Sequence, residues 1–92
     1  MADHLRILVV DDEIEIRRFL RASLGVHGYT VLEASCGQEA LQRALDNRPD
    51  LVILDLGLPD IDGVEITRRI REWSRMPIII LSVRAQEKNK IE

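Results

Sequence analysis

Short apolar runs alternate along this chain with amphipathic stretches. The first run, residues 5–10, is broken only by Arg6, and comparable runs follow at 29–34, 51–54 and 78–81. Continuous apolarity over so few residues is typical of strands that are covered on both faces. We therefore expect four buried strands at these positions.

Apolar residues recur at helical spacing between the runs, which predicts three helices. A capping box of Ser35 and Gln38 is expected to begin the second helix, and Pro49 to close it. Gly25 and Gly28 are expected to end the first helix. The apolar stripes are Ile16, Phe19, Leu20 and Leu24, then Ala40, Leu41, Ala44 and Leu45, then Ile66, Ile70 and Trp73.

A polar stretch at 84–92 is expected to begin a fourth helix, so strand and helix alternate four times. This order predicts an α/β fold in which helices cover both faces of a parallel sheet. Repeats and linkers are absent from the sequence, which predicts a single domain over 1–92. In such doubly wound sheets the working residues gather at the carboxyl ends of the strands, beside a switch in strand order.

Composition narrows the class of protein without changing the fold prediction. The 92 residues carry 13 basic and 16 acidic side chains, a net charge of −3, and this mild acidity disfavours unaided binding to nucleic acid. A single cysteine, Cys36, excludes an internal disulfide framework. The apolar runs are too short for a membrane helix, and no signal peptide is recognisable. We expect a cytoplasmic protein that does not enter membranes.

Acidic side chains end two of the predicted strands. Asp11 and Asp12 follow the first strand, Asp55 follows the third, and Ser82 follows the fourth. Clustered carboxylates repel one another unless a cation neutralises them, and oxygen ligands of this kind favour Mg²⁺. Mg²⁺ prefers a few protein carboxylates together with phosphate oxygens, which indicates half of a phosphate site.

Asp55 is the best candidate for a nucleophile at such a site, because it stands alone at its strand end and a glycine-containing loop follows it. A carboxylate can accept a phosphoryl group as an aspartyl phosphate. Gly57 is a candidate to offer its backbone carbonyl to the metal, and Ser82 to donate a hydrogen bond to a phosphoryl oxygen. Taken singly, an Asp after a strand is more often a cap or turn residue, as we expect for Asp60 and Asp62.

Three segments of the sequence resemble the receiver domain of two-component response regulators. The resemblance covers the whole chain and implies a flavodoxin-like (CheY-like) fold. Its specificity comes from the combination of the motifs rather than from any one of them. The segments are ILVVDDE at 7–13, LVILDLGLPDIDG at 51–63 and PIIILS at 77–82.

Further segments resemble a subgroup of this family, the OmpR/PhoB-type transcriptional regulators. The likeness is greatest to regulators of potassium-transport operons, which implies control of such genes by the full-length protein. These segments are IRRFLR at 16–21, LDLGLPD at 54–60 and IREWS at 70–74.

The resemblance assigns a role to each strand-end residue. It implies that Asp55 is the phosphoacceptor and receives its phosphoryl group from a histidine on a sensor kinase. Asp11 and Asp12 are the acidic pair that serves Mg²⁺, and the carbonyl of Gly57 joins them as a ligand. Ser82 is the hydroxyl that moves toward the phosphoryl group on activation.

The sequence departs from the family pattern at its C-terminal side. The fifth strand with its lysine, the switch aromatic and the last helix are not found, and Lys88 and Lys90 lie in the predicted fourth helix instead. Residues 1–92 are therefore expected to form a C-terminally truncated receiver domain. Homodimerisation and DNA binding are expected only of the full-length protein, the latter through a further C-terminal domain.

Two alternatives to the phosphorylated signalling module stay open at the level of sequence. Haloacid-dehalogenase-type phosphatases also use an Asp nucleophile with Mg²⁺, but they carry a second Asp two residues later, where this chain has Gly57. An interaction module that is not phosphorylated is the other alternative. Glycine-rich nucleotide-binding motifs do not occur. We expect a signalling module rather than an enzyme.

Overall fold

The computed structural model describes residues 5–81, in which strands and helices alternate as the sequence predicts. All four predicted strands and all three predicted helices within this range are confirmed, with small shifts at their ends. The fourth predicted helix, at 84–92, lies outside the described residues. The elements are β1 (Arg6–Val10), α1 (Ile14–Val26), β2 (Thr30–Ala34), α2 (Gly37–Asn47), β3 (Leu51–Asp55), α3 (Gly63–Arg71) and β4 (Ile78–Leu81).

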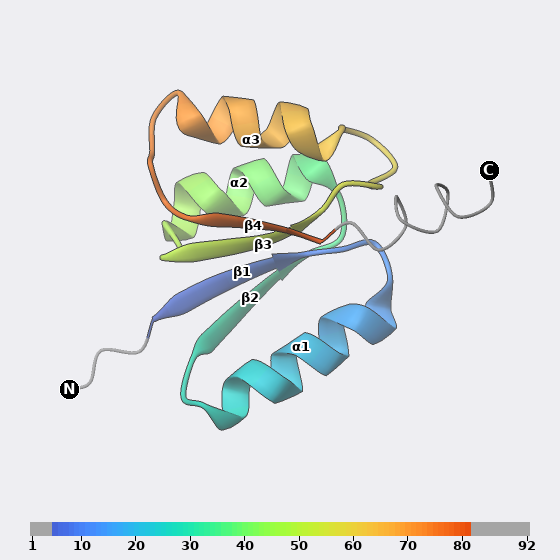
Figure 1. Ribbon diagram of the computed structural model, residues 1–92, viewed down its shortest axis with the longest axis vertical. Coiled ribbons are helices and arrows are strands. Elements are labelled where there is room, and N and C mark those ends of the chain that lie inside the picture. The colour runs from blue at the N-terminus through green and yellow to red at the C-terminus, as the bar shows by residue number, and fades with distance from the viewer. Residues whose placement is uncertain (1–4, 82–92) are drawn as a thin grey trace.

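The strands form one parallel sheet in the order β2-β1-β3-β4. Figure 1 shows α1 on one face of this sheet and α2 with α3 on the other. The doubly wound arrangement follows from the crossovers, because the chain moves from β1 to one side and returns past it to β3. The switch in direction therefore lies between β1 and β3, and their carboxyl ends meet at one edge.

The main core lies between the sheet and the pair α2 and α3. Alternate strand residues point to this side, and Ile66 and Ile70 of α3 are fully buried against them. A smaller cluster of Ile7, Val9 and Ile53 lies on the face that α1 covers. Within residues 5–81, no helix has the length and apolar character needed to cross a membrane.

The apolar stripe of α1 packs only in part as predicted. Ile16, Leu20 and Leu24 are half-buried, whereas Phe19 is 68% exposed, so its assignment to the packed face was wrong. Phe19 lies about 100° around the helix from Leu20, which takes it off the face that meets the sheet. Leu45 of α2 and Trp73 are also exposed, and Trp73 lies beyond the last residue of α3.

Two predicted helix ends also needed correction. Gly25 lies inside α1, and the turn after the helix is made by Gly28, whose φ of +87° is the left-handed region that favours glycine. The capping box of Ser35 and Gln38 is wrong because α2 begins one residue later, with Cys36 as its N-cap. Glu39 Oε1 instead accepts hydrogen bonds from the Ser35 backbone N–H at 2.7 Å and hydroxyl at 3.0 Å.

Candidate functional site

The carboxyl end of β1 is anchored on both sides by hydrogen bonds. Asp11 follows the last residue of β1, and its backbone N–H donates to the carbonyl of Ala34 in β2 at 3.1 Å. Its carboxylate Oδ1 accepts from the backbone N–H of Glu13 at 2.9 Å, a turn that leads directly into α1. Asp11 is only 2% exposed, while Asp12 beside it is open to solvent.

An arginine of α1 braces this strand end. Arg17 Nη1 donates to the backbone carbonyl of Asp11 at 2.8 Å, and Arg17 Nε donates to Glu33 Oε1 of β2 at 3.0 Å. Arg21 Nη1 also meets Glu33, at 2.6 Å from Oε2. The Arg21 hydrogen bond, helped by that of Arg17, outweighs desolvation and lowers the pKa of Glu33. This brace was not foreseen from the sequence, where its signal is Glu33, the lone charged residue in the apolar run of β2.

The carboxyl end of β3 presents a single buried carboxylate. Asp55 is the last residue of β3 and is 4% exposed, and its Oδ1 accepts from the backbone N–H of Gly57 at 3.2 Å. In the sheet register Asp55 is paired with Leu81, the last residue of β4. Ser82, the predicted hydroxyl group, is the next residue in the sequence and lies outside the described residues.

The loop after Asp55 contains two aspartates that act as caps, as predicted. Asp62 caps its own helix, with Oδ1 accepting from the Val64 N–H at 3.1 Å. Asp60 caps a different helix: it accepts from the backbone N–H groups of Gly37 at 2.7 Å and Gln38 at 2.9 Å, at the start of α2. The N–H of Gln38, followed by that of Gly37, lowers the pKa of Asp60. That Asp60 reaches α2 was not foreseen from the sequence.

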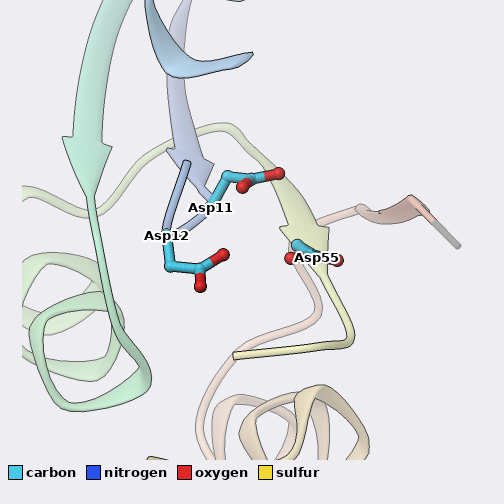
Figure 2. A group of neighbouring side chains, drawn as sticks. All are labelled: Asp11, Asp12 and Asp55. Atoms are coloured by element: carbon cyan, nitrogen blue, oxygen red, sulfur yellow. The ribbon is translucent and has the colours of Figure 1, made fainter. Parts of the chain in front are cut away.

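The two strand ends bring three carboxylates together. Asp11, Asp12 and Asp55 each offer an oxygen atom within 4.8 Å of the others. Figure 2 shows the three carboxyl groups gathered around the space between the ends of β1 and β3. Opposite ligands of an octahedral Mg²⁺ stand about 4.2 Å apart, so a small inward movement or a bridging water fits this spacing. The all-oxygen donor set suits a hard cation, and the exposed side at Asp12 leaves room for water or phosphate.

Comparison with known proteins agrees with this geometry. The family model described as the response regulator receiver domain matches residues 7–92. The KDP operon transcriptional regulatory protein KdpE of Escherichia coli (strain K12) is 52% identical over 85 residues, which cover 92% of this chain. The transcriptional regulatory protein ResD of Bacillus subtilis (strain 168) is 45% identical over 87 residues, or 95% of this chain. The predicted likeness to receivers, and among them to a potassium-transport regulator, is confirmed.

Solved structures confirm the predicted flavodoxin-like fold. A response regulator receiver domain protein from Clostridium thermocellum superposes with a TM-score of 0.84 at 34% identity, covering 95% of this chain and 71% of that one. The chemotaxis response regulator CheY4 of Vibrio cholerae gives a TM-score of 0.82 at 31% identity, covering 97% and 80%. Against the curated relatives the coverage is smaller, since the chain spans 38% of the length of KdpE and 36% of ResD.

Proposed function

Because this chain belongs to the family of response regulator receiver domains, we propose that it accepts a phosphoryl group on Asp55 and acts as a signalling module rather than as an enzyme. The observation that carries this proposal is the position of Asp55. Its carboxylate is buried at the switch in strand order and lies within 4.8 Å of oxygen atoms of Asp11 and Asp12. Gly57 occupies the place where a haloacid-dehalogenase-type phosphatase would carry its acid, so hydrolysis by that route is not favoured.

The donor is a phosphohistidine on a sensor histidine kinase. A carboxylate oxygen of Asp55 attacks the phosphorus, the phosphorus–nitrogen bond breaks, and the histidine nitrogen leaves and takes up a proton. The hydrogen bond from the Gly57 N–H to Oδ1 orients the Asp55 carboxylate for this attack. Burial on both sides of the sheet confines the approach of the donor to the edge beyond the strand ends.

Asp11, Asp12, Asp55 and the backbone carbonyl of Gly57 are the groups that we propose hold Mg²⁺. When bound, the ion supplies positive charge that offsets the negative charge of the transferring phosphoryl group. The support for this assignment is the all-oxygen donor set and its spacing. The bond from the Arg17 guanidinium to the Asp11 carbonyl keeps the acidic pair in place, whether or not a cation is present.

In the longer protein, phosphorylation is proposed to control dimerisation and DNA binding through a separate domain. Support comes from the relatives named as transcriptional regulatory proteins, among them the regulator of the KDP operon. The proposed targets are potassium-transport genes, and the proposed location of the protein is the bacterial cytoplasm. Ser82 is proposed to donate a hydrogen bond to the phosphoryl group, because it follows the residue that pairs with Asp55 in the sheet.

The test is labelling of the chain by a small phosphodonor such as acetyl phosphate in the presence of Mg²⁺. We expect label on the unaltered chain and none on Asp55→Asn, because the amide keeps the shape of the side chain but is a poor nucleophile. Asp46→Asn is the matched control, since Asp46 is exposed and its carboxylate accepts hydrogen bonds from Gln42 of its own helix.

Equal labelling of Asp55→Asn and the unaltered chain would overturn the assignment of Asp55. Absence of label on the unaltered chain, with a longer version labelled under the same conditions, would favour the alternative of an interaction module that is not phosphorylated.

A further inference from the structure

The loop between β3 and α3, residues 56–62, connects the proposed phosphoacceptor to the rest of the molecule. It begins directly after Asp55 and includes Gly57, whose N–H donates to the Asp55 carboxylate. Loops of this length have many conformations open to them unless contacts select one. The conformation of this loop decides where Gly57 lies relative to the three carboxylates.

The base of the loop is closed by a backbone contact. A Cβ added at Gly63 would lie 2.7 Å from Leu56 Cδ2, 3.0 Å from Leu56 Cα and 3.3 Å from the Asp55 carbonyl oxygen. The first turn of α3 therefore packs directly on the residue that follows Asp55. Only a residue without a side chain permits this approach.

The far side of the loop is fastened to a different helix by Asp60. Its Oδ1 accepts from the Gly37 N–H at 2.7 Å and from the Ile61 N–H at 2.8 Å, and its Oδ2 accepts from the Gln38 N–H at 2.9 Å. The Gly37 and Gln38 groups are the first N–H groups of α2, which have no partner within the helix. The carboxylate also lies at the positive end of the helix dipole.

The approach of α2 to the loop is as close as backbone allows. A Cβ at Gly37 would lie 2.7 Å from Ile61 Cβ and 3.1 Å from Asp60 Oδ1. Glycine at position 37 is thus required for the same contact that Asp60 makes. Two separate features, the hydrogen bonds and the close packing, hold residues 60–61 against the start of α2.

We propose that Asp60 is a positioning residue for the metal and phosphoryl site, acting as a clasp that fixes the loop 56–62 to α2 and so holds Gly57 beside Asp55. With the base closed at Gly63 and the far side held by Asp60, the short stretch 57–59 between them has little freedom. The inference rests on the proposed function only in so far as Gly57 serves the bound Mg²⁺. The fastening of the loop is independent of any ion.

The experiment compares Asp60→Asn with Asp62→Asn in the 92-residue chain. Both aspartates lie in the same loop and both cap a helix, but Asp62 caps α3 within its own segment. In Asp60→Asn the amide nitrogen must face one of the α2 N–H groups, so a hydrogen bond becomes a contact between two donors. Both variants are expected to lower the melting temperature, and this shared loss measures the merely structural effect of a cap.

Two further measurements separate the variants. Hydrogen exchange of the Gly57 amide, followed by NMR without metal, is expected to accelerate in Asp60→Asn and to stay near the unaltered rate in Asp62→Asn. The dissociation constant for Mg²⁺, from titration of the same amide resonances, is expected to rise about tenfold in Asp60→Asn only, the lower end of what outer partners of metal ligands contribute.

Unchanged exchange at Gly57 in Asp60→Asn, or equal changes in exchange and Mg²⁺ affinity in the two variants, would overturn the clasp. Asp11→Asn serves as the reference for the proposed metal site. If the unaltered chain and Asp11→Asn respond identically to Mg²⁺, the metal assignment fails, and the clasp is then decided by the exchange of Gly57 alone.

Discussion

The two halves of the candidate site are built in different ways. At the end of β1 a guanidinium group braces the backbone that carries two adjacent carboxylates, because Arg17 of α1 donates both to the backbone carbonyl of Asp11 and to the Glu33 carboxylate of β2. At the end of β3 stands a single carboxylate, that of Asp55, which accepts from the N–H of Gly57 in the loop 56–62. This loop is held by the Asp60 carboxylate, which accepts hydrogen bonds from the first backbone N–H groups of α2.

This difference matches the two proposed roles, which are to hold a cation at the end of β1 and to form a covalent bond at the end of β3. The β1 half has short connections and an ion-paired brace, which suits a pair of ligands that must stay in one geometry. The β3 half carries the proposed phosphoacceptor and leads into a loop and then α3, so a change at Asp55 has a route to a neighbouring surface. The comparison is testable because each half offers its own set of substitutions.

The largest expected effect separates the halves by their dependence on Mg²⁺. Asp11→Asn and Asp12→Asn each remove a proposed Mg²⁺ ligand of the β1 half, so we expect the Mg²⁺ concentration for half-maximal labelling to rise by at least about tenfold. Because Asp55 is intact, labelling is expected to recover at high Mg²⁺. Asp55→Asn is expected to stay unlabelled at every Mg²⁺ concentration. The measurement is labelling by acetyl phosphate across a Mg²⁺ series.

Asp46→Asn again controls for the loss of one negative charge. Recovery of labelling in Asp55→Asn at high Mg²⁺ would erase the distinction between the halves, as would failure of both β1 variants to recover despite an intact fold.

The second effect concerns packing at two glycines, and it has opposite signs at Gly63, which closes the loop of the β3 half, and at Gly25, near the C-terminal end of α1. Gly63→Ala places a methyl group 3.0 Å from Leu56 Cα, and overpacking of this kind costs about 1–3 kcal/mol in the free energy of unfolding. Gly25→Ala in α1 meets nothing within 4 Å and is expected to stabilise by about 0.5–1 kcal/mol through helix propensity. Urea denaturation of the two variants checks both values. An unchanged free energy of unfolding in Gly63→Ala would mean that the loop moves to accommodate the methyl group more easily than its contacts indicate.

The third effect tests the brace of the β1 half. Arg17→Met keeps much of the apolar stem but removes the donor to the Asp11 carbonyl and one partner of Glu33, with an expected loss of about 1 kcal/mol in unfolding free energy. Arg18→Met, on the exposed side of the same helix, is the matched control and is expected to change stability little. The Mg²⁺ dependence of labelling should shift in Arg17→Met alone, and equal behaviour of the two variants would contradict the brace.

Much of the fold was predictable because burial of a strand or a helix face leaves a local pattern. The run before Asp11, the run before Asp55 and the stripe through Ile66 and Ile70 each reported burial correctly. Burial was predicted wrongly at the edges of the apolar helix faces, at Phe19 and Trp73. Periodicity gives the direction of a side chain but not whether another element packs against it.

The carboxylate cluster of the site was predictable from the sequence, but the contacts that support it were not. Parallel strands deliver their carboxyl ends to one edge, so the meeting of Asp11, Asp12 and Asp55 followed from strand order. The supports around them were not foreseen, since the contacts of Arg17 with Glu33 and of Asp60 with Gly37 depend on how helices cross the sheet and join residues far apart in sequence. The partner of Ser35 was also not foreseen. Because α2 begins one residue later than predicted, Glu39 rather than Gln38 accepts the hydrogen bond from the Ser35 backbone N–H.

The smallest effect distinguishes the two fastenings by pH and salt. The pKa of Glu33 lies below its ordinary value of 4.5 in the folded protein, chiefly through Arg21, and the pKa of Asp60 lies below 3.8, chiefly through the N–H of Gln38. Because the pKa of each carboxylate is lowered by folding, its ionised form stabilises the fold at pH values above the ordinary pKa. This contribution is lost as the pH falls through the lowered pKa of the folded protein. The stability gap between the unaltered chain and each variant is therefore expected to be constant near neutrality. It is expected to shrink below about pH 4.5 for Glu33→Gln and below about pH 3.8 for Asp60→Asn. Salt separates them, because raising it from 0.1 to 1 M shortens the screening length from about 10 to about 3 Å and weakens an ion pair more than hydrogen bonds to backbone. In urea titrations the Glu33→Gln gap should narrow in 1 M NaCl while the Asp60→Asn gap persists, and equal narrowing would show that both halves are held by the same kind of interaction.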